Sequence, residues 1–277
     1  MALLNRGRPS IGLDIGSSHV KLMELEQDPK TGRNRLISFG MARLPPEAIV
    51  DGAVMNSNVI VDAIRELVAR HRVKTKNVVA SVSGNSVIIK RINLPRMTSD
   101  ELEESIQWEA EQYIPFDIND VNIDVQILEG ASDDPNQMEV LLVAARKELV
   151  NEYQALIQQA GLKPAVIDVD AFAISNMFED SYDVPTESVA LVNVGASNVN
   201  IHVLRNGVSA FTRDIAAGGR QFTEEIQRSL NISFEEAEAM KVGGDEKDRA
   251  SVVPEEIERI LSNVGEGLAL EVQRSLD

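Results

Sequence analysis

The chain has 277 residues, 43% of them hydrophobic, and its 44 acidic against 27 basic residues give a formal net charge of −17. A chain of this length can bury a sizeable core and form two domains. The acidic balance disfavours nucleic-acid binding and a direct hold on anionic lipid, because both need a basic surface. The absence of cysteine excludes disulfides, thiolate metal ligands and a cysteine nucleophile. With no apolar run of membrane-spanning length, we expect a cytoplasmic protein without direct membrane insertion.

The chain contains an internal repeat. Residues 11–25 recur in degenerate form, without a gap, as residues 190–204. Each copy is predicted to form an apolar strand, a glycine-containing tight turn and a second strand with alternating side chains. The aligned pairs include Asp14 with Asn193, Gly16 with Gly195, Ser18 with Ser197 and Val20 with Val199. Two such hairpins indicate two related halves.

The turn of the repeat suits phosphate binding. A glycine lets the backbone approach a ligand closely, and small hydroxyl residues beside it leave successive N–H groups pointing into one concavity. Asp14, at the end of the first strand, is expected to hold magnesium through water, since magnesium usually takes one or two carboxylates plus substrate phosphates. A single copy would be read as a plain hairpin turn. The second copy favours two turns that close on one phosphate chain.

The first part of the chain predicts a mixed sheet covered by helices. After the first hairpin, residues 35–43 are expected to form a third antiparallel strand. Residues 56–71 carry an apolar stripe at helical spacing, and residues 77–83 follow as a buried strand. This order of three strands, a helix and a strand favours an α/β sheet with helical cover.

The stretch from residue 86 to 161 predicts a small α+β insertion. Strands are expected at 86–94, 121–128 and 139–145. A helix follows the capping box that begins at Thr98, and a second one spans 147–160. Trp108, the single tryptophan, lies off the apolar stripe of the first helix. It is therefore either covered by a neighbouring element or left for a partner.

The remaining chain repeats the strand-rich pattern and ends in helices. A strand at 164–170 and a helix at 171–179 precede a crossing at 182–187 and the second hairpin. Residues 208–215 predict another strand, and residues 216–219 lead into a helix. Ser233 begins a capping box whose helix stops near Gly243, and Pro254 opens a long final helix.

Four motifs, in this order, resemble the nucleotide-binding elements of the actin, Hsp70 and sugar-kinase superfamily. They are Asp14-x-Gly16 with Lys21, Asn193-x-Gly195, Gly218-Gly219, and the tetrapeptide Glu238-Ala-Met-Lys241. The insertion narrows the resemblance through Ile92-Asn-Leu-Pro95, residues 109–116, residues 144–147 and residues 160–164. These motifs closely resemble PilM, a family of FtsA-like cytoplasmic proteins of type IV pilus assembly, over essentially the whole chain.

The resemblance implies a bilobed actin-like fold, of the FtsA/PilM type, with RNase H-like subdomains. Subdomain 1A would comprise 1–85 and 162–184, split around an inserted α+β subdomain 1C at 86–161. Subdomain 2A would comprise 185–219 and 265–277, incomplete at its C-terminal side, split around subdomain 2B at 220–264.

The resemblance also implies that ATP and Mg²⁺ bind in the cleft between the lobes. One lobe would contribute Asp14, Gly16, Ser17, Ser18 and Lys21 to the phosphates, with Asp14 holding magnesium through water. The other would contribute Asn193, Gly195, Ala196 and Ser197 to the phosphates, and Gly218, Gly219, Glu238 and Lys241 to the adenosine.

As partner, the resemblance implies the cytoplasmic N-terminal tail of a PilN-like inner-membrane protein, lying in a groove between 1A and 1C. ATP would close the lobes and reshape that groove. The chain would thus be a nucleotide-regulated scaffold of the pilus assembly platform, serving twitching motility. It would be held peripherally at the inner membrane by protein partners, among which other platform proteins and motor ATPases also come into consideration.

Two departures from the superfamily pattern affect the expected activity. Asn193 stands where a second aspartate is usual, and an amide can hydrogen-bond a metal-bound water without adding charge. We therefore expect at most a slow ATPase, and no catalytic residue is assigned. The superfamily's second adenosine strand, a Gly-Gly segment, is absent before Asp277, which would leave the adenine pocket open on one side.

Two other functions fit the same superfamily. A small-molecule kinase needs a general base near the transferred phosphate, and Asp168 and Asp170 are the candidate carboxylates. Both also fit ordinary strand-end positions. An actin-like filament-forming protein is the third alternative, although the sequence offers no signature of a polymer contact.

Overall fold

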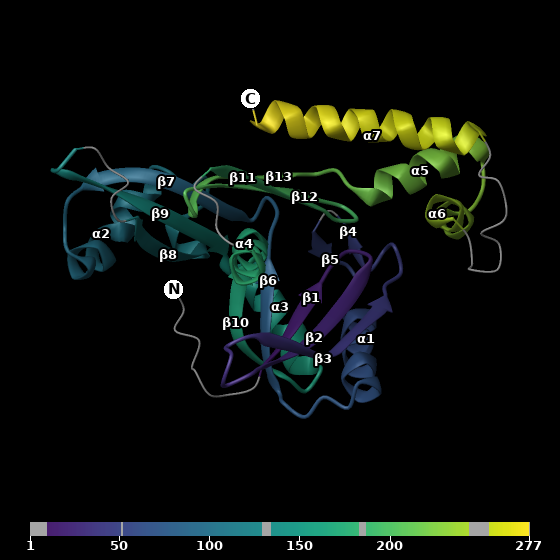
Figure 1. The fold of residues 1–277 in the computed structure, drawn as a ribbon, viewed down its shortest axis with the longest axis horizontal. Helices are drawn as coiled ribbons and strands as arrows, with labels where there is room; N and C mark the ends of the chain where they lie inside the picture. Colours follow the sequence, from purple (N-terminus) through teal and green to yellow (C-terminus); the bar gives the residue numbers. More distant parts are fainter. Residues whose placement is uncertain (1–9, 51, 129–133, 183–186, 244–254, 277) are drawn as a thin grey trace. The chain divides into compact units, whose positions relative to one another are not determined.

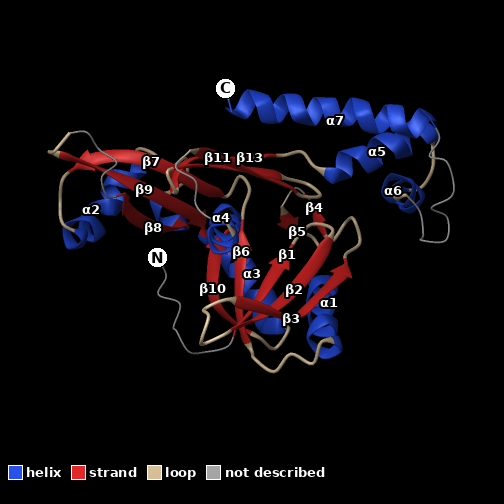
Figure 2. Ribbon diagram, viewed as in Figure 1, coloured by secondary structure: helices blue, strands red, loops and turns tan. Residues whose placement is uncertain are grey.

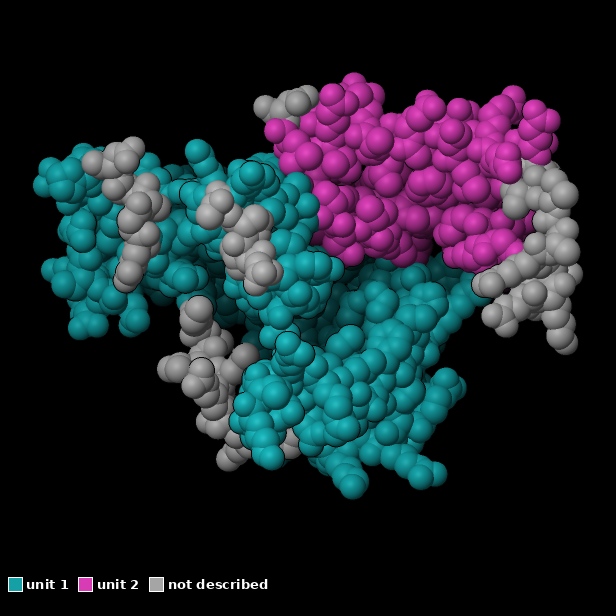
Figure 3. Space-filling view, in the orientation of Figure 1, with its two compact units in different colours: residues 1–191, 202–212 teal, residues 192–201, 213–277 magenta. Residues whose placement is uncertain are grey.

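The computed structural model describes residues 10–50, 52–128, 134–182, 187–243 and 255–276. The chain divides into two compact units, each of which is described by itself (Figure 3). Unit 1 comprises Met1–Leu191 and His202–Thr212, and unit 2 comprises Val192–Ile201 and Arg213–Asp277. No helix within the described residues is both long and apolar enough to span a membrane.

A five-stranded mixed sheet forms the centre of unit 1, with strand order β10-β6-β1-β2-β3 (Figures 1 and 2). Its strands are β1 (Ser10–Ile15), β2 (His19–Gln27), β3 (Asn34–Arg43), β6 (Asn77–Val82) and β10 (Lys163–Val169). β1, β2 and β3 pair antiparallel, whereas β6 is parallel to both β1 and β10. Alternation along β1 buries Ile11, Leu13 and Ile15 on one face, as period-two patterning requires. The predicted α/β sheet is confirmed.

Two helices bury their apolar stripes in the core of this sheet. Helix α1 (Ser57–Arg70) begins at Asn56, whose side chain accepts a hydrogen bond from the Val59 N–H. Helix α3 (Lys147–Gln159) contributes Tyr153, Leu156 and Ile157 to the same core cluster. This helix was expected within the 86–161 insertion, yet its buried residues pack with the five-stranded sheet.

The insertion has a sheet and a core of its own. Strands β7 (Val87–Pro95), β8 (Val121–Leu128) and β9 (Gln137–Arg146) pair antiparallel in the order β7-β9-β8. The predicted capping box is present at the start of α2 (Ser99–Glu111), where Thr98 and Glu101 bond to each other's backbone N–H. The 3₁₀ turn η1 spans Ile118–Asp120. The core joins strand and helix residues, namely Ile92, Leu94, Leu102, Ile106, Ala110, Ile114, Val121, Met138, Val140, Leu142 and Ala144.

A three-stranded sheet contains the second hairpin, with strand order β11-β12-β13. Its strands are β11 (Ser188–Val194), β12 (Val199–Arg205) and β13 (Val208–Ile215), and helix α4 (Asp170–Ser181) precedes them. His202, on β12, is 2% exposed. Its Nδ1 lies 2.9 Å from the Ala171 carbonyl and its Nε2 lies 3.0 Å from Ser209 Oγ. Because a carbonyl only accepts, Nδ1 carries the hydrogen and Nε2 accepts from the serine.

Three helices make up the core of unit 2. They are α5 (Gly219–Leu230), α6 (Phe234–Val242) and α7 (Glu255–Leu276), and their shared cluster contains Ile226, Ala237, Ile257 and Ile260. The capping box predicted at Ser233 is present at the start of α6. The start predicted for the last helix, Pro254, lies outside the described residues. The short pair β4 (Ile49–Val50) and β5 (Ala53–Val54) in unit 1 was not predicted.

Candidate functional site

The first glycine bend connects β1 to β2 in unit 1. The Gly16 N–H donates to the His19 carbonyl at 3.1 Å, which closes the turn. Asp14 lies opposite Lys21 in the strand register, and the two side chains form an ion pair at 2.8 Å. A Cβ added at Gly16 would lie 3.7 Å from Asp14 Oδ1, so the carboxylate borders the bend. The predicted residues of this group therefore gather at one end of the hairpin.

The second bend repeats this hydrogen bond in unit 2. The Gly195 N–H donates to the Asn198 carbonyl at 2.9 Å. A Cβ at Gly195 would approach that carbonyl to 2.9 Å, compared with 3.2 Å between a Cβ at Gly16 and its own turn carbonyl. Real side chains avoid contacts below 3.0 Å, so this turn favours glycine on steric grounds alone. The sequence repeat is thus a repeat of local geometry.

The pair that flanks the bend differs between the two copies. Asn193 and Asn200 occupy the positions of Asp14 and Lys21, and an amide hydrogen bond of 3.1 Å between them replaces the ion pair. Asn200 is 4% exposed and donates onward to Asp214 Oδ1 at 2.8 Å. The second bend therefore keeps the cross-strand contact but lacks the two charges. The carboxylate that these hydrogen bonds reach is Asp214, on β13.

The Gly-Gly turn before α5 is hydrogen-bonded to the backbone of the second bend. The Gly219 and Arg220 N–H groups donate to the Gly195 and Ala196 carbonyls at 2.9 and 2.8 Å. These donors lie at the start of α5, where helical N–H groups have no partner within the helix. They are satisfied by the bend and are not directed at a ligand. A Cβ at Gly218 would lie 2.5 Å from the Gly195 carbonyl oxygen, so this contact leaves room only for glycine.

The predicted adenosine-side pair forms a hydrogen-bonded network with the start of α5. Lys241 Nζ lies 2.6 Å from Glu238 Oε2, and donates to Thr223 Oγ1 at 2.9 Å and to the Gly219 carbonyl at 3.1 Å. Thr223, which is 0% exposed, donates to the same Glu238 oxygen at 2.5 Å. The lysine and glutamate are one turn apart on α6, so one helix presents both to α5. The network ties α6 to the glycine turn.

The structure brings the predicted site residues together in two groups. Unit 1 holds Asp14, Gly16, Ser17, Ser18 and Lys21, and unit 2 holds Asn193, Gly195, Ala196, Ser197, Gly218, Gly219, Glu238 and Lys241. Three further residues join the unit 2 group, namely Asn200, Asp214 and Thr223. Asn200 could have been found from the repeat, since it aligns with Lys21. Nothing in the sequence pattern singles out Asp214 or Thr223.

The two carboxylates considered for a kinase have structural partners. Ser81 donates to Asp170 Oδ1 at 2.5 Å, and Asp168 accepts from the Val169 N–H at 2.8 Å. Burial, with the charge of Asp170, raises the pKa of Asp168, although the backbone hydrogen bond opposes the shift. Tyr153 donates to the Ile15 carbonyl at 3.4 Å, and burial raises its pKa. These contacts connect the end of β10 and helix α3 to the rest of the sheet.

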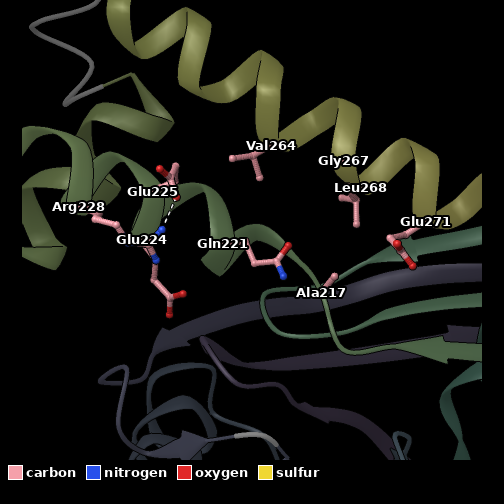
Figure 4. A pocket seen from close by; sticks show the side chains of 9 residues that line it. All are labelled: Ala217, Gln221, Glu224, Glu225, Arg228, Val264, Gly267, Leu268 and Glu271. Carbon is pink, nitrogen blue, oxygen red and sulfur yellow. Dashed lines mark hydrogen bonds and ion pairs between the residues drawn. The ribbon is translucent and has the colours of Figure 1, made fainter.

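A separate pocket of about 420 Å³ lies within unit 2, between α5 and α7 (Figure 4). Val264 and Leu268, which helical spacing assigns to the inner face of α7, line it together with Ala217. Its charged lining is mostly acidic, because Arg228 already pairs with Glu225 at 2.6 Å while Glu224 and Glu271 add further carboxylates. Such a lining disfavours phosphate. No group of three His, Asp or Glu side chains in the described ranges could hold a metal ion.

The chain is similar to several known proteins in fold and in sequence. Among solved structures, a PilM-PilN type IV pilus biogenesis complex matches with a TM-score of 0.82 and 30% identity, over 97% of this chain and 76% of that chain. The ethanolamine utilization protein EutJ from Carboxydothermus hydrogenoformans matches with a TM-score of 0.57 and 17% identity, over 95% and 70% of the two chains. MreB5 of Spiroplasma citri bound to ADP matches with a TM-score of 0.54 and 13% identity, over 98% and 79%. The last two show the actin-like fold alone.

Curated relatives include the cell division protein FtsA. The Bacillus subtilis protein is 25% identical over 261 residues, which cover 86% of this chain and 58% of FtsA. The protein of Neisseria meningitidis serogroup B is 26% identical over 255 residues, which cover 83% and 60%. The chain thus spans less than two thirds of these relatives. A family model described as type IV pilus assembly protein PilM matches residues 12–277. With nearly its whole length matched by that model, the chain belongs to the PilM family of type IV pilus assembly proteins.

Proposed function

We propose that this chain is a nucleotide-regulated scaffold of the type IV pilus assembly platform. The observation that carries the proposal is the repeated glycine bend, closed by the same hydrogen bond at Gly16 and at Gly195. One bend would serve the phosphates of ATP with Asp14, Ser17, Ser18 and Lys21. The other would serve them with Asn193, Ala196 and Ser197, while Gly218, Gly219, Glu238 and Lys241 would face the adenosine. MreB5 of Spiroplasma citri, which shares the fold, has been solved with ADP and with AMPPNP.

The first bend could hold a hydrated magnesium ion, with Asp14 contacting the ion through water. Asp14 is the carboxylate that borders the bend, and its side chain is 53% exposed, so hydrated Mg²⁺ could reach it. Magnesium needs only one or two carboxylates when phosphates supply further oxygens. When bound, the ion would neutralise phosphate charge. Asp14 would orient its water shell, and Lys21 would face the phosphates.

We further propose that hydrolysis is slow at best. Asn193 is engaged with Asn200 and carries no charge, and the carboxylate of Asp214 is two hydrogen bonds away. The second bend therefore lacks a charged side chain at the position that mirrors Asp14. A neutral amide can hold a water molecule, but it orients a metal or an attacking water less strongly than a carboxylate does.

The proposed partner is the N-terminal cytoplasmic tail of a PilN-like inner-membrane protein. One solved structure that this chain resembles is described as a PilM-PilN type IV pilus biogenesis complex. We place the tail in a groove between subdomain 1A, residues 1–85 and 162–184, and the insertion at 86–161. Protein partners, among them further platform proteins and motor ATPases, would hold the chain at the cytoplasmic face of the inner membrane.

The nucleotide proposal is tested by measuring the affinity for Mg-ATP with calorimetry. Lys21→Ala should weaken binding at least tenfold, because a positive charge beside the phosphates is lost. The matched control is Lys30→Ala, which removes an exposed lysine from the turn between β2 and β3. Equal affinities for Mg-ATP in the two variants would show that Lys21 does not contribute to nucleotide binding.

The scaffold proposal is tested with a peptide of the PilN-like tail, titrated with and without Mg-ATP. We expect different affinities, since a ligand shifts another site only when it discriminates between two states of the protein. Equal affinity in both conditions would refute the coupling. Absence of binding in both would refute the scaffold role itself.

A further inference from the structure

The helix α2 of the insertion is strongly acidic. Its 13 residues include acidic side chains and no basic one; the acidic residues are Asp100, Glu101, Glu103, Glu104, Glu109 and Glu111. Glu101 is used by the capping box. Within the described residues, the other five take part in no ion pair. The helix therefore presents uncompensated negative charge.

Trp108 lies in the middle of this acidic surface. Leu102, Ile106 and Ala110 point into the core of the insertion, whereas the tryptophan is 79% exposed. Glu104 and Glu111, four residues before and three after it, lie beside it on the helix surface. Of the two sequence-based alternatives, cover by a neighbouring element is therefore wrong for the described chain. The helix combines a large apolar side chain with an acidic frame, which suits a basic partner surface.

A short basic run occurs elsewhere in unit 1, after helix α1. Arg70, Arg72, Lys74 and Lys76 are exposed and alternate with half-buried residues. Arg70 pairs with Glu66, whereas the other three cations take part in no ion pair of the described residues. In a chain with 44 acidic and 27 basic residues, four cations within seven positions form a local exception.

Backbone hydrogen bonds hold this run in place. The Arg72 N–H donates to the Ala69 carbonyl at 3.2 Å, and the Val73 N–H donates to the Val68 carbonyl at 3.1 Å. At the other end, the Lys163 N–H donates to the Lys76 carbonyl at 2.7 Å, which ties the run to β10. A fixed segment loses little conformational entropy when it binds.

We propose that Trp108 and its acidic frame on one copy of the chain dock against residues 70–76 of a second copy. Charge complementarity on this same chain selects the second copy as the occupant, since each surface carries the charge that the other lacks. An arginine over the tryptophan face would add a cation–π contact. The two surfaces differ, so the contact is head-to-tail, and each docked copy keeps one surface open for the next. This association involves none of the proposed nucleotide residues.

Sedimentation velocity of the full chain over a range of concentrations tests the proposal. At roughly 50 mM salt, the mean mass should rise above the 30.4 kDa of a single chain as concentration increases. At roughly 500 mM salt it should return to the single-chain value, because screening removes the charge attraction. Trp108 is the single tryptophan, so its emission should shift to the blue under the associating conditions.

Charge reversal locates the contact. The acid-side variant combines Glu104→Lys with Glu111→Lys, and the base-side variant combines Arg72→Glu with Lys74→Glu. Each should remain a single chain, whereas their equimolar mixture should associate again, because reversed charges then meet reversed charges. The control combines Glu179→Lys, on α4, with Glu187→Lys, just before β11; both residues are exposed, and this variant should behave as the wild type. Trp108→Ala, which leaves all charges in place, should weaken association about tenfold.

The contrary results are distinct. A wild type that stays a single chain at low salt refutes the proposal. A basic peptide can be added as a separate probe. If the tryptophan emission shifts only when this peptide is present, the surface around Trp108 binds a different protein, and the proposed second copy is the wrong occupant. If the control variant also fails to associate, net charge alone explains the result and the proposed contact is wrong. If the equimolar mixture stays unassociated, the two surfaces do not contact each other.

Discussion

Gly218 offers the sharpest test of how the unit 2 site is built. It adopts an extended φ of 172°, which any residue can adopt, so conformational freedom is not the reason for glycine here. The reason is contact, because an added Cβ would lie 2.5 Å from the Gly195 oxygen and 2.7 Å from the Ala196 oxygen. Gly218→Ala must therefore push the second bend away by roughly 1 Å.

The expected cost follows from this displacement. Overpacking against backbone costs about 1–3 kcal/mol, and each hydrogen bond that breaks between the bend and α5 adds about 1 kcal/mol. We expect the free energy of unfolding to fall by about 2–4 kcal/mol in total. Nucleotide affinity should fall as well, because the bend that is proposed to hold phosphate would move.

Gly219→Ala is the matched control. A Cβ there would find its nearest neighbours at 3.7 and 3.8 Å, which is ordinary van der Waals contact. Since Gly219 is the first residue of α5, alanine should leave stability within about 0.5 kcal/mol or raise it slightly. Urea unfolding followed by circular dichroism compares the two variants. Equal stability would refute the argument that the bend packs tightly against Gly218.

Three further predictions concern buried or partly buried polar groups. Lys241→Met should lower the free energy of unfolding by about 1–2 kcal/mol and weaken nucleotide binding. Calorimetry measures both quantities. A variant with unchanged stability and unchanged affinity would contradict the role of the hydrogen-bonded network between α6 and α5. Burial lowers the pKa of His202 in the folded chain, so the stability that this residue contributes is complete above its ordinary value of 6.5 and is lost as pH falls below it. His202→Gln should remove that loss in urea unfolding at pH 7.5 and 5.5. Burial raises the pKa of Asp168, so its charge destabilises the fold at neutral pH, and the wild type regains this stability as pH falls toward 3.8. Asp168→Asn should be more stable than the wild type at pH 7, and a less stable variant would show that the charge is needed.

Local sequence rules predicted most of the elements in this chain. The capping boxes at Thr98 and Ser233 are both present, because they depend on residues only three positions apart. The strands 121–128 and 208–215 match β8 and β13 in the structure. β4 and β5 escaped prediction, since two strands of two residues each carry no periodicity.

The candidate site divides along the same line. The repeat and the turn chemistry located both glycine bends, because a turn is defined by its own few residues. Asp214 and Thr223 reach the site by side-chain bonds between separate strands and helices, which no local pattern encodes. The requirement for glycine at Gly218 likewise comes from the backbone oxygens of Gly195 and Ala196, which are 23 and 22 residues away in the sequence.

The sequence alone determined that two hairpins share one design, since alternation and glycine position are local properties of 15 residues. Tertiary structure decided how deeply the apolar side chains of each hairpin are buried. Leu13 is 3% exposed in β1, which lies between β2 and β6, whereas its counterpart Val192 is 42% exposed in β11, which pairs only with β12 among the described strands. Burial depends on which elements pack alongside a strand, and that information resides in distant parts of the chain.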